Sequence, residues 1–329
     1  MTPRTQQETS MHSPSRLSRR ALVAATLLGL LVASASAQDY PQRPVSIVVT
    51  LPPGSTVDVL ARAFGQQLSQ RLKQSVVVEN KPGAGLMLGM QNVAAAPADG
   101  HMLAFTPVTP LTIQPHRTKT SYAMDSFVPL CQTFENVFFL AVPSSSPHTS
   151  AKGVLEHLKA QPGKLRYGHS GTGSAPHLMA EEMWRSLGVS ATDVPYRGET
   201  AFGPDLMAGV LDAGMVTTSM LQQLKFRPLA VFAPERSKAF PDVPTTAELG
   251  AKVLPSAYGG LFVRAGTAPE VVSRLEGLCK DIVATPAYQK QAETLQQNAT
   301  YLDRDAFARR LTDDAQAKGK LLSQLKLRD

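Results

Sequence analysis

Short apolar segments alternate with helical patterns along this chain, and the alternation starts twice. The first series predicts strands at residues 45–51, 75–79 and 102–106, with helices at residues 58–72 and 86–96 between them. The second series, after Pro143, predicts helices at residues 151–160, 175–187 and 200–207 and strands at residues 165–170, 192–196, 213–217 and 229–233. Strands that alternate with helices form mainly parallel sheets covered on both faces. Two such series predict two similar α/β lobes, followed by a tail at residues 269–325 that is nearly all helical.

The N-terminal 37 residues have the pattern of a secretory signal peptide. A basic segment precedes an apolar segment of about 13 residues at 21–33, and small residues follow at 35–37. The apolar segment is too short for a membrane-spanning helix, which needs ~20 residues. We therefore expect cleavage near Ala37 and a mature protein in the periplasm. Whether export uses the general or the twin-arginine route stays open, as does a start at Met1 or Met11.

Composition excludes some classes of function. The formal net charge of +7 falls to about +4 once the four arginines and one glutamate of the predicted leader are removed. Basic clusters with interleaved aromatic residues are missing from the sequence, so nucleic-acid binding is not expected. A modest positive charge suits a small anionic ligand.

The chain has two cysteines, Cys131 and Cys279, and both lie in apolar contexts. They could form a disulfide in an oxidising compartment, but we expect two free buried thiols. Two cysteines alone do not make a metal site, and the histidines have no metal-ligand spacing. We therefore expect neither a metal nor a cofactor.

Two turns that follow predicted strands have the chemistry of an anion-binding loop. They are Pro53-Gly54-Ser55-Thr56 and Ser170-Gly171-Thr172-Gly173-Ser174. Glycine allows close backbone approach, the hydroxyls are neutral donors, and the N-terminus of the following helix carries a partial positive charge. Either turn alone is adequately explained as an N-cap, because Ser and Thr are preferred there. The pair, one in each lobe, predicts a clamp for an anion in the cleft between the lobes.

Ser170 also belongs to a possible nucleophile elbow, Gly168-His169-Ser170, in which a serine sits on a strained strand-to-helix turn. The fifth position of that motif is Thr172 rather than glycine. The last histidine in the chain is His177, so a triad in the order Ser, Asp, His cannot be completed downstream. An exported serine hydrolase that uses Ser170 is therefore an alternative only, and we expect no catalytic residue and no enzyme.

A set of ordered motifs carries a resemblance to a known family. They include "PPGSTVDVLARAFGQQL", "VVVENKPGAG", "APADGHMLAF", "YGHSGTGSAPHL", "VPYRG" and "ERSKAFPDVPTTAELG", and they extend over essentially all of the expected mature chain. In this set the sequence resembles the receptors of tripartite tricarboxylate transporters, also called the Bug family. The resemblance implies the periplasmic binding-protein fold of the second type, with two α/β lobes and two crossing hinge strands.

The resemblance also implies a division of the chain and a set of ligand-binding loops. Apolar segments at residues 138–142 and 260–263 suit the hinge strands, so lobe 1 comprises residues 38–138 and 262–329 and lobe 2 residues 139–261. The implied ligand-binding residues are Pro53, Gly54, Ser55, Thr56 and Asp58 in a first loop (residues 53–58), Ser170, Gly171, Thr172, Gly173, Ser174 and His177 in a second loop (residues 170–177), and Thr106 in a third loop (residues 106–110). We expect Asp58 to cap the first helix, because an anion beside an anionic ligand is unfavourable unless it is satisfied.

Departures from the family pattern affect the ligand. Val57 stands in the first loop, and the third loop contains Pro107 and Pro110, which have no N–H to donate. These changes predict a single carboxylate with an apolar or aromatic body rather than a tricarboxylate.

Together the sequence predicts an exported, monomeric receptor that captures a small carboxylate and delivers it to a membrane permease. A sensor that docks on a membrane signalling partner would share the same pocket residues and stays open as an alternative, and the ligand's identity stays open too.

Overall fold

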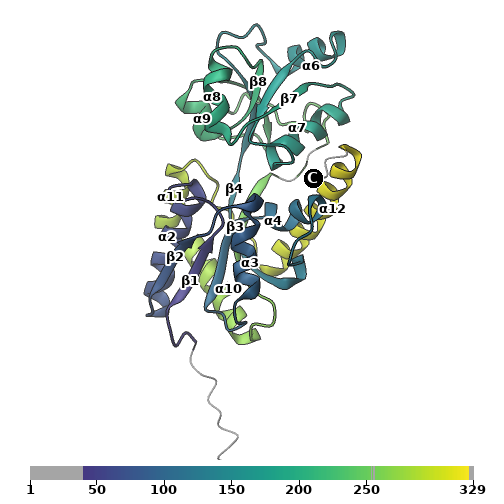
Figure 1. Cartoon of the computed structure of the whole chain (residues 1–329). Coiled ribbons are helices and arrows are strands. Elements are labelled where there is room, and N and C mark those ends of the chain that lie inside the picture. Colours follow the sequence, from purple (N-terminus) through teal and green to yellow (C-terminus); the bar gives the residue numbers. More distant parts are fainter. Residues whose placement is uncertain (1–39, 253, 255, 326–329) are drawn as a thin grey trace, which may run out of the picture. The chain divides into compact units, whose positions relative to one another are not determined.

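A computed structural model describes residues 40–252, 254 and 256–325 of the chain (Figure 1). The chain divides between residues 42 and 43, and the fold described below is that of the part from residue 43 onward. The signal peptide expected at residues 1–37 lies outside the described residues.

Five strands form the first sheet, in the order β2-β1-β3-β10-β4. Along the chain they are β1 (Val45–Val49), β2 (Val76–Asn80), β3 (Met102–Pro107), β4 (Phe127–Asn136) and β10 (Ala257–Arg264). Strand β1 runs parallel to β2 and β3, whereas β10 runs antiparallel to its neighbours β3 and β4. Four strands of this sheet therefore share one direction, and β10 opposes them.

The second sheet repeats this arrangement in the order β7-β6-β8-β5-β9. Along the chain its strands are β5 (Phe138–Val142), β6 (Arg166–His169), β7 (Thr192–Pro195), β8 (Ala213–Thr217) and β9 (Arg227–Phe232). Strand β6 is parallel to β7 and β8, and β5 is antiparallel to β8 and β9. The two similar α/β lobes are confirmed, and each sheet is mixed because one strand runs against the other four.

The chain passes from the first sheet to the second between β4 and β5, which are separated by Val137 alone. Strand β4 leaves the first sheet beside the carboxyl end of β3, since β10 pairs Gly259 with Pro107 and Ala257 with Asn136. Strand β5 enters the second sheet with Phe138 opposite Thr217, the last residue of β8. The carboxyl ends of the parallel strands in both sheets therefore converge on this crossing, and the chain returns between β9 and β10.

Helices cover both faces of the first sheet (Figure 1). They are α2 (Thr56–Leu72), α3 (Met87–Ala95), α4 (Thr109–Thr112), α5 (Gln114–Arg117), α10 (Pro269–Val283), α11 (Pro286–Thr294) and α12 (Arg304–Leu325), with short 3₁₀ helices at Ala84–Leu86 and Met124–Ser126. On one face, side chains of α3, α4 and α12 share an apolar core with β1, β3 and β10. On the other face, Phe64 of α2 and Tyr288 of α11 form an aromatic cluster with Phe105 of β3.

The second sheet is covered in the same way by α6 (Ala151–Ala160), α7 (Ala175–Ser186), α8 (Glu199–Met207) and α9 (Thr218–Gln223). Helices α6 and α7 share one core with the sheet, and α8 and α9 share the other. Leu321 and Leu322 near the end of α12 also belong to the core of α6 and α7. The predicted helical tail thus forms three helices, and the last of them contacts both sets of elements.

Most predicted helices and strands occur within two residues of the expected bounds. Strand β4 was not predicted, and its composition explains why. It contains Pro129 together with polar residues such as Gln132 and Glu135, which hide a strand pattern. Both polar side chains are satisfied by Arg310 of α12, whose guanidinium donates to Gln132 Oε1 at 2.8 Å and to Glu135 Oε1 at 2.7 Å.

The prediction of two free thiols is wrong, because Cys131 of β4 and Cys279 of α10 form a disulfide with their Cα atoms 6.5 Å apart. The expected burial is confirmed, since both residues are fully buried. The two positions are 148 residues apart in the chain, and helix α10 packs on β4 only through the tertiary fold. An apolar context in the sequence therefore predicted the burial but not the pairing.

Candidate functional site

The first loop is closed by its own hydrogen bonds. Ser55 is the N-cap of α2, and its hydroxyl accepts a hydrogen bond from Asp58 N–H at 3.3 Å. In return, Asp58 Oδ2 accepts from Gly54 N–H at 2.8 Å, so the carboxylate at the third helical position holds the residue that precedes the N-cap. Gly54 has a φ of +79°, a conformation that glycine adopts without steric cost. The expectation that Asp58 caps the first helix is wrong, because Ser55 is the N-cap and the Asp58 carboxylate bonds the residue before it.

Asp58 is also held from the side. Arg62 of α2 and Asn80 of β2 donate to its two carboxylate oxygens at distances of 2.8 to 3.1 Å. Burial alone would raise the pKa of the Asp58 carboxyl, but the hydrogen bonds from Arg62, Gly54 and Asn80 outweigh burial and the pKa lies below its ordinary value. The carboxylate is therefore ionised and fully engaged within the protein, so it does not repel an incoming anion as a bare charge would.

Two backbone donors remain at the start of α2. Within the described residues, the N–H groups of Thr56 and Val57 meet no acceptor. Helix α2 has 17 residues, and the aligned peptide dipoles place a partial positive charge at this end. The first loop therefore offers an anion two N–H groups and a favourable potential.

Thr106 of the third loop turns its side chain into the protein rather than toward a ligand. It is fully buried, its hydroxyl lies 2.7 Å from the hydroxyl of Thr50, and it donates to Pro107 C=O at 2.9 Å. The bond to Thr50 joins the segment after β1 to the end of β3. Thr106 thereby positions the first loop relative to the third.

The second loop is shaped by two glycines and a helix cap. Gly171 has a φ of +121° and Gly173 a φ of +71°, and both conformations are unfavourable for other residues. Ser174 is the N-cap of α7, and its hydroxyl accepts from His177 N–H at 3.4 Å. Ser174 N–H in turn donates to Gly171 C=O at 3.0 Å.

Two of the backbone donors expected to hold the ligand are engaged by histidines. Gly173 N–H donates to His177 Nδ1 at 2.8 Å, and Gly171 N–H donates to His169 Nδ1 at 3.2 Å. Among the described residues, the hydroxyls of Ser170 and Thr172 and the N–H of Thr172 have no hydrogen-bond partner. The donors that the second loop can offer to a ligand therefore include those of Ser170 and Thr172.

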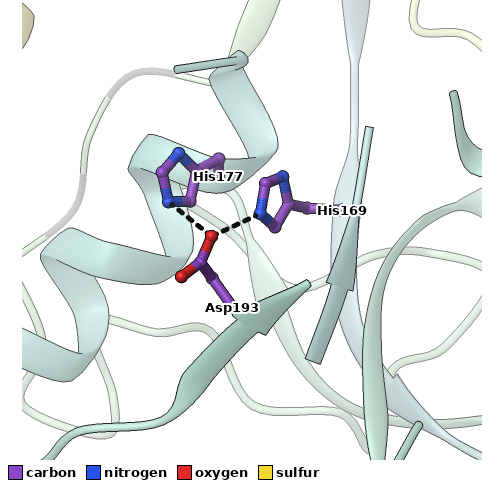
Figure 2. A group of neighbouring side chains, drawn as sticks. All are labelled: His169, His177 and Asp193. Carbon is purple, nitrogen blue, oxygen red and sulfur yellow. Dashed lines mark hydrogen bonds and ion pairs between the residues drawn. The ribbon is translucent and has the colours of Figure 1, made fainter. Parts of the chain in front are cut away.

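Figure 2 shows the group that lies beneath this loop, with His169 from β6, His177 from α7 and Asp193 from β7. Asp193 Oδ2 lies 3.3 Å from His169 Nε2 and 3.8 Å from His177 Nε2. The two imidazoles stack, with ring centroids 4.2 Å apart and planes at 11°. Burial and the neighbouring His169 lower the pKa of His177 to about 4, and burial also lowers the pKa of His169. Both rings are therefore neutral at pH 7.

The three side chains bring their potential ligand atoms within 4.8 Å of one another, as a metal site requires. The stacking works against that use, because nitrogen lone pairs lie in the ring planes and an ion between two parallel rings lies outside both planes. His177 Nδ1 also accepts a backbone hydrogen bond, whereas a metal-bound histidine normally donates from its second nitrogen. The arrangement fits a hydrogen-bonded support for the loop better than a metal centre.

A cation that the sequence did not single out lies beside the second loop. Arg117, the last residue of α5, donates from NH1 to Thr172 C=O at 2.9 Å. A Cβ atom on Gly173 would lie 2.7 Å from the same nitrogen. Arg117 therefore joins a helix of the first sheet to the candidate anion loop of the second. Its position could not be read from local pattern, since 55 residues separate it from Thr172.

Ser170 has no catalytic partner in the described part of the chain. His169 Nδ1 faces Gly171 and its Nε2 faces Asp193, while His177 Nδ1 is taken by Gly173. The observed hydrogen bonds therefore provide no general base for Ser170, and they do not favour the hydrolase alternative.

A separate cavity of about 1110 Å³ lies at the crossing between the sheets. Its lining comes from residues 135–137, α9, residues 233–239, α11 and residues 296–300, and Gln296 donates to Gln222 across it. None of the ligand-binding residues expected from the sequence lines this cavity. The carboxyl edges of the two sheets thus carry both the predicted loops and this separate cavity.

The two sheets have the same topology, and the carboxyl ends of their parallel strands converge on one crossing. Loops at helix N-termini lie at these strand ends. This arrangement is that of a two-lobed α/β solute-binding protein. Residues 60–327 match the model of the tripartite tricarboxylate transporter family receptor, and the chain belongs to this family. A UPF0065 protein of Bordetella pertussis is 32% identical over 282 residues, which cover 84% of this chain and 86% of that protein.

Solved structures agree with this assignment. A TctC solute-binding protein from Polaromonas is similar with a TM-score of 0.77 and 28% identity, covering 87% of this chain and 99% of that one. The protein Rpa4515 of R. palustris, solved with adipate, is similar with a TM-score of 0.74 and 25% identity, covering 87% and 98%. In residues 40–252, 254 and 256–325, no helix has both the length and the hydropathy to cross a bilayer.

Proposed function

We propose that this protein is a periplasmic receptor that binds one small carboxylate between its lobes, without covalent change, and delivers it to a membrane permease. Membership of the receptor family supports the general role. The observation that carries the proposal for this chain is the pair of loops at the carboxyl edges of the two sheets. Each loop precedes a helix N-terminus, and the first has N–H groups without an acceptor among the described residues.

In this proposal the hinge divides the chain as the sequence suggests, with lobe 1 formed by residues 38–138 and 262–329 and lobe 2 by residues 139–261. The N–H groups of Thr56 and Val57 bind the carboxylate from one side, and the donors of Ser170 and Thr172 bind it from the other. Arg117 adds a positive charge beside the second loop. The protein acts as a monomer and carries no catalytic group.

The proposed ligand has one carboxylate and an apolar body. Gly171 and Gly173 N–H are engaged by histidines, and Pro107 and Pro110 have no N–H to donate. The loops therefore have few donors, and every further carboxylate that is desolvated without partners costs several kcal/mol. Rpa4515 was solved with adipate. Adipate has two carboxylates joined by an apolar chain, so it is a useful intermediate between monocarboxylates and citrate.

A thermal-shift screen tests the proposal, because a ligand that binds the folded state raises its melting temperature. The screen compares benzoate, octanoate, adipate and citrate at one pH and one ionic strength, with calorimetry for any compound that raises the melting temperature. We expect benzoate or octanoate to stabilise the protein more than citrate does. Stabilisation by citrate alone would contradict the proposed ligand class, and no stabilisation by any carboxylate would contradict the proposed function. Mass spectrometry of ligand released from protein purified without refolding identifies the natural compound.

A further inference from the structure

The shape of the second loop depends on an acceptor that lies inside the protein. Gly173 is buried, and its N–H points to His177 Nδ1 at 2.8 Å rather than to the surface. His177 lies in the first turn of α7 and is 3% exposed. A buried N–H that loses its acceptor costs more than an ordinary hydrogen bond contributes, so the loop conformation and the state of this imidazole are coupled.

The hydrogen bond to Gly173 determines the tautomer of His177. A neutral imidazole has one donor and one acceptor nitrogen, and Nδ1 accepts, so the proton is on Nε2. That nitrogen faces Asp193 Oδ2 at 3.8 Å, and the same oxygen lies 3.3 Å from His169 Nε2. Asp193 thus favours a proton on Nε2 of His169, whose Nδ1 lies 3.2 Å from Gly171 N–H and 3.0 Å from Gly171 C=O. At 3.8 Å the same carboxylate attracts a proton on Nε2 of His177 electrostatically, and His177 Nδ1 stays available to Gly173.

We propose that His177 is a positioning residue for the carboxylate site: as a neutral acceptor it holds Gly173 N–H inward, and the loop then presents the donors of Ser170 and Thr172 to the ligand. This inference rests on the proposed function. Protonation of Nδ1 would place a donor against Gly173 N–H, so the loop would lose this conformation and ligand binding would weaken in acid.

Some of the charged and titratable groups around the His177 imidazole favour its protonation, and others oppose it. Arg117 of α5 and His169 of β6 disfavour a positive charge on His177, and Asp193 of β7 favours it. Glu181 on α7 accepts from Tyr167 OH at 2.6 Å, and Tyr167 packs against His169. Burial of the ring is the largest influence and lowers the pKa of His177, which is consistent with an acceptor that stays neutral over the physiological range.

The test compares His177→Asn with His177→Leu in the mature protein. Asn retains an acceptor, because its Oδ1 is bonded to Cγ as Nδ1 is in histidine, whereas Leu fills a similar volume without one. With benzoate or octanoate as the probe, we expect affinity to fall about tenfold or more in His177→Leu and by less than about threefold in His177→Asn. The affinity of wild-type protein should fall as the pH drops from about 5 to about 3, around the pKa of about 4, and the part of that fall caused by His177 should be absent in His177→Asn. His157→Leu, on α6, is the matched control for loss of an imidazole in the same lobe.

A ligand-free measurement separates this inference from the proposed function. Two-bond ¹H–¹⁵N spectra of the wild-type protein report the tautomer of each histidine, and amide exchange reports the protection of Gly173. We expect the Nε2–H tautomer at His177 and a protected Gly173 amide. An Nδ1–H tautomer, or equal loss of affinity in the Asn and Leu variants, would overturn the positioning role. If neither probe binds the wild-type protein, the proposed ligand fails while the spectra still decide the role of His177.

Discussion

The disulfide between Cys131 and Cys279 makes the most quantitative prediction. It joins β4 to α10 and closes a loop over a sequence separation of 148 residues. Loop-closure entropy for a loop of this length stabilises the folded state by about 5 kcal/mol at most. Because globular proteins unfold at a cost of about 5–15 kcal/mol, loss of this bond should remove a large share of the stability.

The measurement is equilibrium unfolding in urea, followed by far-UV circular dichroism. Oxidised wild-type protein is compared with the double variant Cys131→Ala, Cys279→Ala and with wild-type protein unfolded and refolded in reductant. The reduced wild type retains both sulfur atoms, so it isolates the bond from the small cavities left by alanine. We expect the free energy of unfolding to fall by about 3 to 5 kcal/mol in both cases. A change of less than about 1 kcal/mol in reduced protein, or a thiol titration that finds two free cysteines in the folded chain, would refute the reasoning.

Three further predictions concern the loops. The pKa of His177 lies at about 4, below the 6.5 of an unfolded histidine, so the unfolded state binds the extra proton first as the pH falls. Urea titrations should therefore show the free energy of unfolding falling from pH 6.5 to pH 4. Up to about 3 kcal/mol of that loss should be absent in His177→Asn. Gly173→Val combines an unfavourable φ of +71° with a Cβ 2.7 Å from Arg117 NH1. Calorimetry should therefore show a larger loss of carboxylate affinity for this variant than for Ser174→Ala, which removes one hydrogen bond of about 1 kcal/mol. The reverse order would mean that the Ser174 hydroxyl carries recognition. Asp58→Asn should lower the free energy of unfolding by about 1 kcal/mol, because it weakens the hydrogen bonds from Gly54 N–H and Arg62, and an unchanged urea midpoint would contradict that role.

Elements with strong local patterns were predictable from the sequence. Strands β1 and β8 are short apolar segments, and α6 and α7 repeat apolar residues at helical spacing, so their positions follow from residue periodicity alone. The caps at Ser55 and Ser174 are equally local, because a side chain bonds an N–H three residues away. The ordered loop motifs also predicted the family that residues 60–327 match.

The tertiary structure decided the contacts between residues far apart in the chain. Strand β4 is stabilised by Arg310, Cys131 meets Cys279, and Arg117 reaches the second loop, yet no short pattern in the sequence records any of these pairs. The sequence contains His169, His177 and Asp193 but does not show that they meet. Their contact requires β6 and β7 to pair and α7 to pack beside them. Local periodicity determines which face of an element is buried, whereas sheet order and packing determine what that face meets. The donors of the second loop were therefore predictable as a set, and only the fold decided which of them the histidines engage.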